Sequence, residues 1–385
     1  MKAPSSRQAD IGPPDRAGTP GEPSRVQGIA IIIIAFAVVL FLLVQARFLL
    51  ISLVSAIVLF SLTRTAINVI AGRKIGPLRV PNWLASAVAV GFIAAALLTL
   101  TSIILAQLNT VLVTTLSYTE QAPAAIAAMF SWLGADAEKA VLNSVRSVEI
   151  SGYLRAIAGQ AGVLMQATVL IILFVGFLFA ERVWFSTKLV NIIGDEKQAE
   201  RVARIVESIT LRVNRYLLVK TLVSVVTGVM IWGVGVLFGL ELAVALGIVT
   251  FVLNYIPNLG SIIATAIVTL VAYVQLGEAA TTLGIFLVTG AIQFINGNVI
   301  DPMLMGRALR MSSFGIILSL AFWSAVWGIP GMFLSVPIMV ALMIVCSEVS
   351  ALRPIAILLS REGLPEPEMS PRPVPDAAAQ DPASK

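Results

Sequence analysis

The chain has 385 residues, of which 58% are apolar and 12% charged, whereas a soluble globular domain is about 45–50% apolar and about 25% charged. A water-soluble core cannot bury this apolar excess, so the composition, with a mean hydropathy of +0.94, indicates an all-α polytopic membrane protein. The absence of histidine and the single cysteine, Cys346, exclude a histidine-ligated metal site, a histidine-containing catalytic triad and a disulfide scaffold. In such a chain the net charge of +5 indicates cytoplasmic loops rather than affinity for nucleic acid.

Both ends of the chain are rich in proline and lack apolar periodicity. Eleven of the nineteen prolines fall within the first 25 and the last 24 residues, interleaved with Ser, Gly, Ala and mixed charge. Segments of this composition cannot bury enough apolar surface to fold, so we expect a disordered tail over 1–27 and a mostly disordered tail over 349–385. No secretory cleavage pattern follows the first apolar run, which should therefore remain as a membrane anchor.

Between these tails, six windows are apolar enough to be simple membrane spans, each of which needs about 20 residues. Basic residues gather in the N-terminal tail, between the second and third windows, and over 182–220. The positive-inside rule then places these three segments, and both termini, in the cytoplasm. The six windows are 28–44, 48–63, 83–106, 163–180, 216–238 and 279–295.

Two connections between the spans have a character of their own. Residues 107–162 carry more acids than bases, so we expect them outside, as a partly helical insertion that follows the first three spans in 28–106. Residues 194–215 place apolar side chains at helical spacing on one face and charges on the other. This pattern predicts an amphipathic cytoplasmic helix within the middle segment, 163–240.

The segment 241–348 is expected to form a transport domain built of broken helices. Two stretches in it, 242–275 and 314–346, are apolar but too long for one span, and NYIPNLG and WGIPG interrupt them midway. Because proline ends a helix and glycine permits a tight reversal, each stretch is predicted to fold back as a re-entrant helical hairpin with arms about half a membrane long. The positions of the charges favour entry from opposite faces of the membrane. The alternative is that each stretch is a kinked pair of ordinary spans.

Polar and helix-breaking residues gather at these interruptions. A polar group in hydrocarbon must find a partner, so they predict a polar pathway for a solute or ion, with simple helix-to-helix hydrogen bonds as the alternative. Asp301, which precedes Pro302 and could pair with Arg307, is the candidate for ion coupling; its alternative role is a cytoplasmic cap or salt bridge. The candidate pathway residues are Asn254, Pro257, Asn258, Gly260, Ser261, Gln293, Asn296, Asn298, Asp301, Gly328, Pro330 and Gly331.

Other motifs narrow the class of protein. The spacing of Gly228, Gly235 and Gly239 is typical of close helix packing and predicts a tight contact there. No G-x-x-x-x-G-K-[ST] motif is present in the sequence, so a phosphate cradle for an ATP-driven pump is excluded. No intramembrane protease site can be assembled either, and we expect neither an enzyme nor a bound cofactor or metal. A pore remains an alternative to a carrier.

Three ordered stretches, FVLNYIPNLGSIIA, INGNVIDPMLMGRALRMSS and LAFWSAVWGIPGMFLSVPIMV, resemble the C-terminal half of the autoinducer-2 exporter family, the AI-2E type of membrane transporter. The resemblance covers 246–348. It implies paired re-entrant hairpins, a homo-oligomer that is a pentamer in the family, and an elevator-like movement of the hairpin domain. The family motifs fall on Asn254, Pro257, Asn258, Gly260, Asn298, Pro302, Gly306, Gly328, Gly331 and Pro337.

The resemblance also implies a function. It predicts a secondary transporter or facilitative exporter of a small polar metabolite, similar to autoinducer-2, in the plasma (inner) membrane of a bacterium. The runner-up is a sodium or lithium/proton antiporter of the same family. The expected partners are a small polar solute, sodium or protons, the lipid bilayer and further copies of the chain, without nucleic acid.

Overall fold

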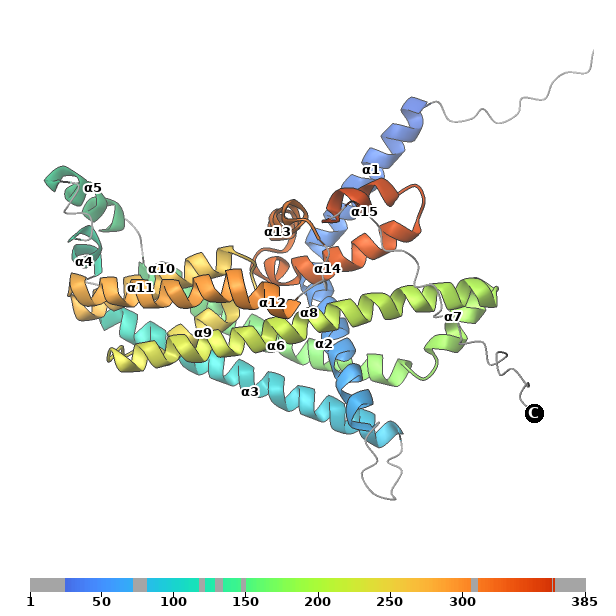
Figure 1. Cartoon of the computed structure of the whole chain (residues 1–385), viewed down its shortest axis with the longest axis horizontal. Helices are drawn as coiled ribbons and strands as arrows, with labels where there is room; N and C mark the ends of the chain where they lie inside the picture. The colour runs from blue at the N-terminus through green and yellow to red at the C-terminus, as the bar shows by residue number, and fades with distance from the viewer. Residues whose placement is uncertain are drawn as a thin grey trace, which may run out of the picture. The chain divides into compact units, whose positions relative to one another are not determined.

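The computed structural model describes residues 25–71, 82–117, 122–128, 134–146, 150–305, 311–361 and 363 (Figure 1). In this part the chain is helical, joined by turns, with one isolated backbone bridge between Met311 and Ser360. It divides into two units, 1–46 and 47–385. Residues 1–24 and 364–385, which make up most of both predicted tails, lie outside the described residues.

The first unit contributes one described helix, α1 (Arg25–Gln45). Its apolar side chains are exposed all round the helix, and residues 26–45 include no charge. A helix that is apolar on every face suits a lipid environment. The helix therefore matches the first predicted span, 28–44.

The second unit contains every other helix. Its N-terminal part consists of α2 (Arg47–Ala71), α3 (Asn82–Ser117), α4 (Ala122–Ala128), α5 (Ala135–Arg146), α6 (Ile150–Glu181), α7 (Phe185–Ile193) and α8 (Glu196–Leu237). Its C-terminal part consists of α9 (Ala243–Leu253), α10 (Leu259–Leu276), α11 (Ala279–Ile295), the π-helix η2 (Asn296–Ile300), α12 (Asp301–Met305), α13 (Ser313–Trp327), α14 (Ile329–Glu348) and α15 (Arg353–Leu359).

Seven helices of the described chain are long and apolar enough to cross a membrane. This confirms the prediction of an all-α polytopic membrane protein. The second predicted span, 48–63, is the exception, because the apolar part of α2 is shorter than a span. The first arms of both predicted hairpins, α9 and α13, are short as well.

Several helices run further than their apolar windows. α3 reaches Ser117 and α6 begins at Ile150, so both extend into the predicted insertion 107–162, which also contains α4 and α5. The predicted amphipathic helix 194–215 and the following span form a single helix, α8, of 42 residues. Asp195 caps its N-terminus, and neither proline nor glycine occurs before Gly228, so nothing ends the helix between them. At about 1.5 Å per residue it exceeds the roughly 30 Å hydrocarbon core about twofold.

The start of the predicted C-terminal tail, 349–385, is ordered as α15. Ala356 and Leu359 are buried in one apolar cluster with Met311 and Val340 of the preceding segments. The Ser312 amide also donates to the Leu359 carbonyl at 2.9 Å. This contact anchors the start of α13 to α15.

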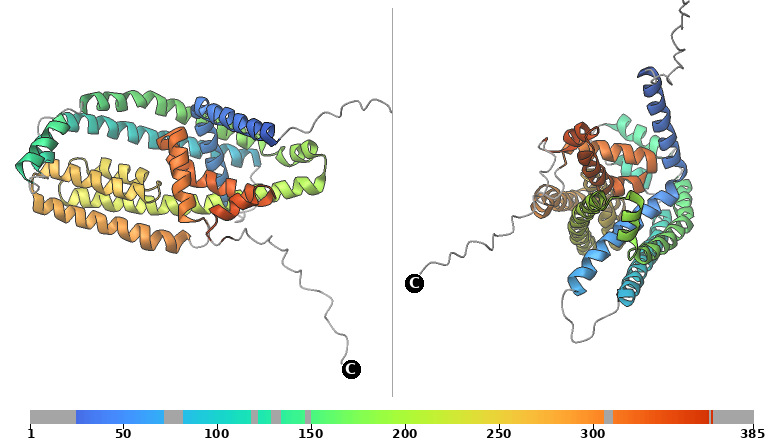
Figure 2. Two further views of the ribbon diagram at one scale, coloured as in Figure 1. Left: turned by 90° about the horizontal axis from the view of Figure 1, so that it is seen from above. Right: turned by 90° about the vertical axis from the view of Figure 1, so that its right-hand side faces the viewer.

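α8 is the helix around which the C-terminal half is organised. It packs against α2, α9, α11, α12 and α14, and the left view in Figure 2 shows α9 and α11 running alongside it. Ser61 and Asn214 join α2 to α8 by two buried hydrogen bonds of 2.8 Å. A second group, α2, α3 and α6, packs through Ala56, Ile93 and Val175.

Small residues let α8 and α9 approach closely, as the glycine spacing predicted. A Cβ atom on Gly228 would lie 2.8 Å from the Gly247 carbonyl oxygen, and one on Gly235 would lie 2.7 Å from Ala243 Cβ. Gly239 instead has a φ of +71° in the turn that follows α8 and makes no such contact.

Replacing Gly228 by alanine should therefore destabilise the protein by about 1–3 kcal/mol, because the new methyl group overpacks the α8–α9 contact. Gly233→Ala is the matched control: it lies on the same helix, and a Cβ atom added there would have no other atom within 4 Å. Thermal denaturation in detergent should give a lower midpoint for Gly228→Ala and an unchanged or higher midpoint for Gly233→Ala. Equal midpoints for the two variants would contradict the close contact.

Candidate functional site

The first predicted interruption is a helix break. α9 ends at Leu253, α10 begins at Leu259, and the intervening Asn258 has a φ of +60°. Asn254 in this turn is buried, and its Nδ2 donates to Ser224 Oγ on α8 at 3.1 Å. The Tyr255 hydroxyl donates to Thr221 Oγ1 on the same helix at 2.8 Å. The turn is thus fastened to α8 by two side-chain hydrogen bonds.

The second interruption is also a helix break, at Gly328, which has a φ of +67°. The two breaks are built alike. A Cβ on Gly260 would lie 1.8 Å from the Leu253 carbonyl oxygen, and a Cβ on Gly331 would lie 1.9 Å from that of Trp323. In each hairpin a glycine at the start of the second arm therefore packs directly on the backbone of the first arm.

The two hairpin tips meet beside α8. The ring centroid of Tyr255 lies 6.0 Å from that of Phe333, near the start of α14, and 5.6 Å from that of Phe251. The second arms are longer than the predicted half-membrane arms: α10 has 18 residues and α14 has 20, enough to cross a membrane. Pro330 lies in the first turn of α14, where proline is tolerated, so the helix starts there instead of after it. Re-entrance from opposite faces stays a prediction.

A third irregularity follows α11, where five residues form the π-helix η2. The Asp301 amide donates to the Asn296 carbonyl five residues earlier, and Pro302 has no amide to donate. Such widened turns are frequent at functional sites. Here Asn296 is buried against α8, whereas Asn298 is exposed and its Nδ2 donates to the Phe294 carbonyl of its own helix.

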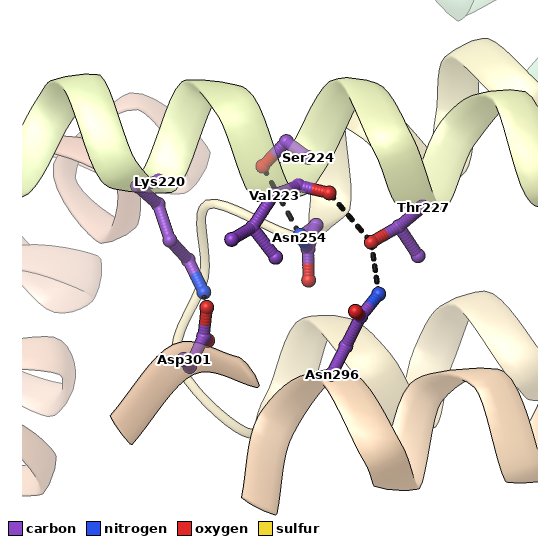
Figure 3. Close-up of polar contacts among 7 residues, drawn as sticks. All are labelled: Lys220, Val223, Ser224, Thr227, Asn254, Asn296 and Asp301. Carbon is purple, nitrogen blue, oxygen red and sulfur yellow. Dashed lines mark hydrogen bonds and ion pairs between the residues drawn. The ribbon is translucent and has the colours of Figure 1, made fainter. Parts of the chain in front are cut away.

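Polar side chains line one face of α8 opposite these irregularities (Figure 3). The Asn296 Nδ2 donates to Thr227 Oγ1, which itself donates to the Val223 carbonyl at 2.7 Å. Lys220, Ser224 and Thr227 follow one another at helical spacing, so they share a face. We call this contact the α8 seam: it consists of Lys220, Thr221, Ser224 and Thr227 with Asn254, Tyr255, Asn296 and Asp301 opposite.

The seam includes an ion pair that the sequence did not predict. Lys220 Nζ lies 2.7 Å from Asp301 Oδ2, and the two side chains are only 5% and 17% exposed. Arg307, the expected partner of Asp301, lies outside the described residues. By its place in the sequence, Lys220 falls at the end of the basic segment 182–220 that was predicted to be cytoplasmic. The spacing of Lys220, Ser224 and Thr227 in the apolar second half of α8 was the available signal.

Several buried oxygen atoms around the seam have no hydrogen-bond partner within the described chain. Tyr216 lies one turn before Lys220, Thr250 one turn before Asn254, and Gln293 one turn before Asn296, each less than 6% exposed. A buried polar atom is costly unless it is paired. The atoms are Tyr216 Oη, Thr250 Oγ1, Gln293 Oε1 and Asp301 Oδ1. The seam can therefore accept further hydrogen bonds or a cation.

The structure unites only part of the predicted pathway. Asn254, Asn296 and Asp301 contact α8, and Gln293 lies on the face of α11 that carries Asn296. Asn258, Asn298 and Pro330 are exposed, and Pro257 and Ser261 are half-buried in the first hairpin. Gly260, Gly328 and Gly331 shape the breaks themselves. Gly306 lies outside the described residues.

The sequence was compared with known proteins. A model of the AI-2E family transporter matches residues 29–351. The AI-2 transport protein TqsA of Escherichia coli is 35% identical over 150 residues, which cover 38% of this chain and 43% of that protein. Putative transport proteins of Borreliella burgdorferi and Haemophilus influenzae are 28% and 32% identical, over 56% and 49% of this chain and 60% and 54% of their own lengths. These alignments thus span about half the length of each relative.

Proposed function

The chain belongs to the AI-2E transporter family, and we propose that it is a secondary transporter or facilitative exporter of a small polar metabolite that passes along the α8 seam. The observation that carries the proposal is the seam itself. Amide, hydroxyl and charged side chains from α8, from the first helix break and from the π-helix meet there, and Lys220, Asn254 and Asn296 among them are buried. Polar groups at broken helices are the usual substrate sites of secondary transporters.

The chemistry of the unpartnered atoms indicates the kind of solute. Gln293 Oε1 can only accept a hydrogen bond, and Thr250 Oγ1 has two lone pairs available. A hydroxylated solute supplies the donors that these oxygens lack. An autoinducer-2-like metabolite fits this requirement, and one relative is named as an AI-2 transport protein.

We place the transporter in the bacterial plasma membrane with both termini cytoplasmic, because basic residues concentrate at 182–220 and in the N-terminal tail. We propose an elevator-like cycle in which the two hairpins move against α8 within a homo-oligomer. The tips support this, because they touch each other through Tyr255 and Phe333, and the first tip is fastened to α8 by side-chain hydrogen bonds that can break. Transport of this kind needs no catalytic residue.

A sodium or lithium/proton antiporter is the second candidate. The Lys220–Asp301 ion pair favours it, since ionisable residues inside a membrane mark ion pathways by default. A pore is the third candidate function. Flux that saturates with solute concentration supports a carrier over a pore, and sodium-driven proton movement without solute supports the antiporter.

Reconstituted protein should take up the labelled autoinducer-2 precursor, and Asn254→Ala or Gln293→Ala should reduce uptake about tenfold, because each loses a buried amide at the seam worth about 1.4 kcal/mol. Asn298→Ala is the matched control. Asn298 is exposed in η2, directly after α11, and its amide donates to the Phe294 carbonyl of its own helical segment, so uptake should stay unchanged. Full uptake by the folded Asn254 and Gln293 variants, or equal loss in all three, would remove the seam as the pathway.

A further inference from the structure

The carboxylate of Asp301 can hold more than the single lysine that it now contacts. We propose that Asp301 is a monovalent-cation site, and that the Lys220 ammonium occupies the position which a sodium ion or a proton takes in another state of the cycle. The inference rests on the proposed transport function. It adds to that function a coupling cation and the residue that competes with it.

The geometry around Asp301 offers oxygen atoms, which are the ligands that hard cations prefer. Asp301 Oδ2 binds the Lys220 ammonium, whereas Oδ1 has no partner within the described chain. The Tyr216 hydroxyl is likewise unpartnered there, and the Tyr216 side chain is 3% exposed. It lies on α8 one turn before Lys220, the residue that binds this carboxylate.

The π-helix offers a third oxygen atom, the backbone carbonyl oxygen of Gly297. In an α-helix the Gly297 carbonyl would accept from the amide of residue 301, and in a π-helix it would accept from that of residue 302. The Asp301 amide instead donates to Asn296, and Pro302 has none. The Gly297 carbonyl thus loses both donors. Helical side chains tilt towards the preceding turn, which for Asp301 is the turn that contains Gly297.

The location of the pair explains why a cation would be needed. Lys220 belongs to α8 and Asp301 to α12, so any movement of one helix against the other separates the two charges. A buried charge left without its partner is strongly destabilising. A sodium ion or a proton at Asp301 removes that cost on the carboxylate side. Movement then depends on the cation, which is the requirement for coupled transport.

Among the described residues, few ionisable groups face this carboxylate. On α8 they are Lys220 and Tyr216, and Tyr255 of the first tip is the further group that interacts with Tyr216. Within the described residues, α12 packs against α8 and η2, and η2 contributes no ionisable side chain. A response to sodium or pH that disappears in Asp301→Asn is therefore assigned to this site.

The test measures cation binding without transport. Full-length protein in detergent is heated in increasing NaCl, with choline chloride holding the ionic strength constant, and separately over a range of pH without sodium. Lys220→Met removes the competing ammonium, so sodium or acid should raise its denaturation midpoint saturably, with half-maximal effect at a concentration at least about tenfold lower than in the unmodified protein. Asp301→Asn should abolish the response.

Arg201→Gln is the control, because it breaks the exposed pair between Arg201 of α8 and Glu348 of α14 and should leave the cation response unchanged. A sodium response identifies the metal ion as occupant, and a response to acid alone identifies the proton. Lys220→Met protein that is as indifferent to sodium and pH as Asp301→Asn overturns the proposal.

If Lys220→Met does not fold, the proposal is tested instead by transport measurements on the unmodified protein in liposomes. Solute uptake driven by an imposed sodium or proton gradient, and lost in Asp301→Asn, supports the cation site. Solute uptake that ignores both gradients overturns the cation site but leaves the proposed carrier intact. If the protein takes up no solute but still shows a cation response that depends on Asp301, the cation site is supported and the proposed cargo is wrong.

Discussion

Gly331→Ala should abolish correct folding of the second hairpin, and Gly260→Ala should do the same for the first. The added Cβ atoms would lie 1.9 Å and 1.8 Å from backbone carbonyl oxygens, distances that no real Cβ contact shows. The obstacles are main-chain atoms, so the two arms of a hairpin must separate to make room. We expect losses above about 4–5 kcal/mol, the range reached only by the most disruptive substitutions.

The yield of monodisperse protein and its denaturation midpoint measure this effect. Gly284→Ala on α11 is the control, because an added Cβ atom there would have no other atom within 4 Å and alanine favours a helix. It should express normally and melt at or above the unmodified midpoint. If Gly331→Ala and Gly260→Ala behave like Gly284→Ala, the arms do not pack as described.

Lys220→Met should destabilise the protein by about 3–5 kcal/mol, because it leaves the Asp301 carboxylate buried without its partner. Asp301→Asn should destabilise the protein by a similar amount, because it leaves the Lys220 ammonium buried without its partner. The double variant Lys220→Met/Asp301→Asn removes both charges, so it should recover most of the lost stability, since buried ion pairs can be replaced by neutral groups at little cost. Denaturation midpoints of the four proteins measure the coupling as a double-mutant cycle.

The exposed Arg201–Glu348 pair gives the comparison for that cycle. Its side chains are 59% and 35% exposed, so solvent screens the attraction, and Arg201→Gln should change stability by less than about 1 kcal/mol. Additive effects of Lys220→Met and Asp301→Asn, with no recovery in the double variant, would mean that the two charges do not depend on each other.

The breaks in the helices could be read from the sequence because they follow from local backbone chemistry. Proline and glycine in NYIPNLG and WGIPG leave few helical conformations available, and the chain breaks at Asn254–Asn258 and at Gly328. Helix boundaries that depend on tertiary packing were harder to predict from the sequence. α14 starts before Pro330 and not after it, and α8 continues through the polar segment 194–215 because no residue ends it.

The candidate site was predictable only in part. Asn254 and Asn296 stood out as amides beside apolar runs, and both bond to α8. Asn298 stood out for the same reason, but its side chain is exposed and donates to the Phe294 carbonyl of its own helical segment. Lys220 was missed because its place in the sequence, at the end of a basic stretch, is typical of a loop charge, whereas its helix face determines that it is buried.

Composition and local motifs by themselves determined that this protein is a helical membrane protein with two interrupted hairpins, because hydropathy and backbone restrictions act within a few residues of chain. The tertiary structure alone decided that Lys220 meets Asp301 and that Tyr255 meets Phe333. Those contacts depend on the rotation and register of helices far apart in the sequence. Packing of all the helix faces together sets these two variables, and no short stretch of residues encodes them.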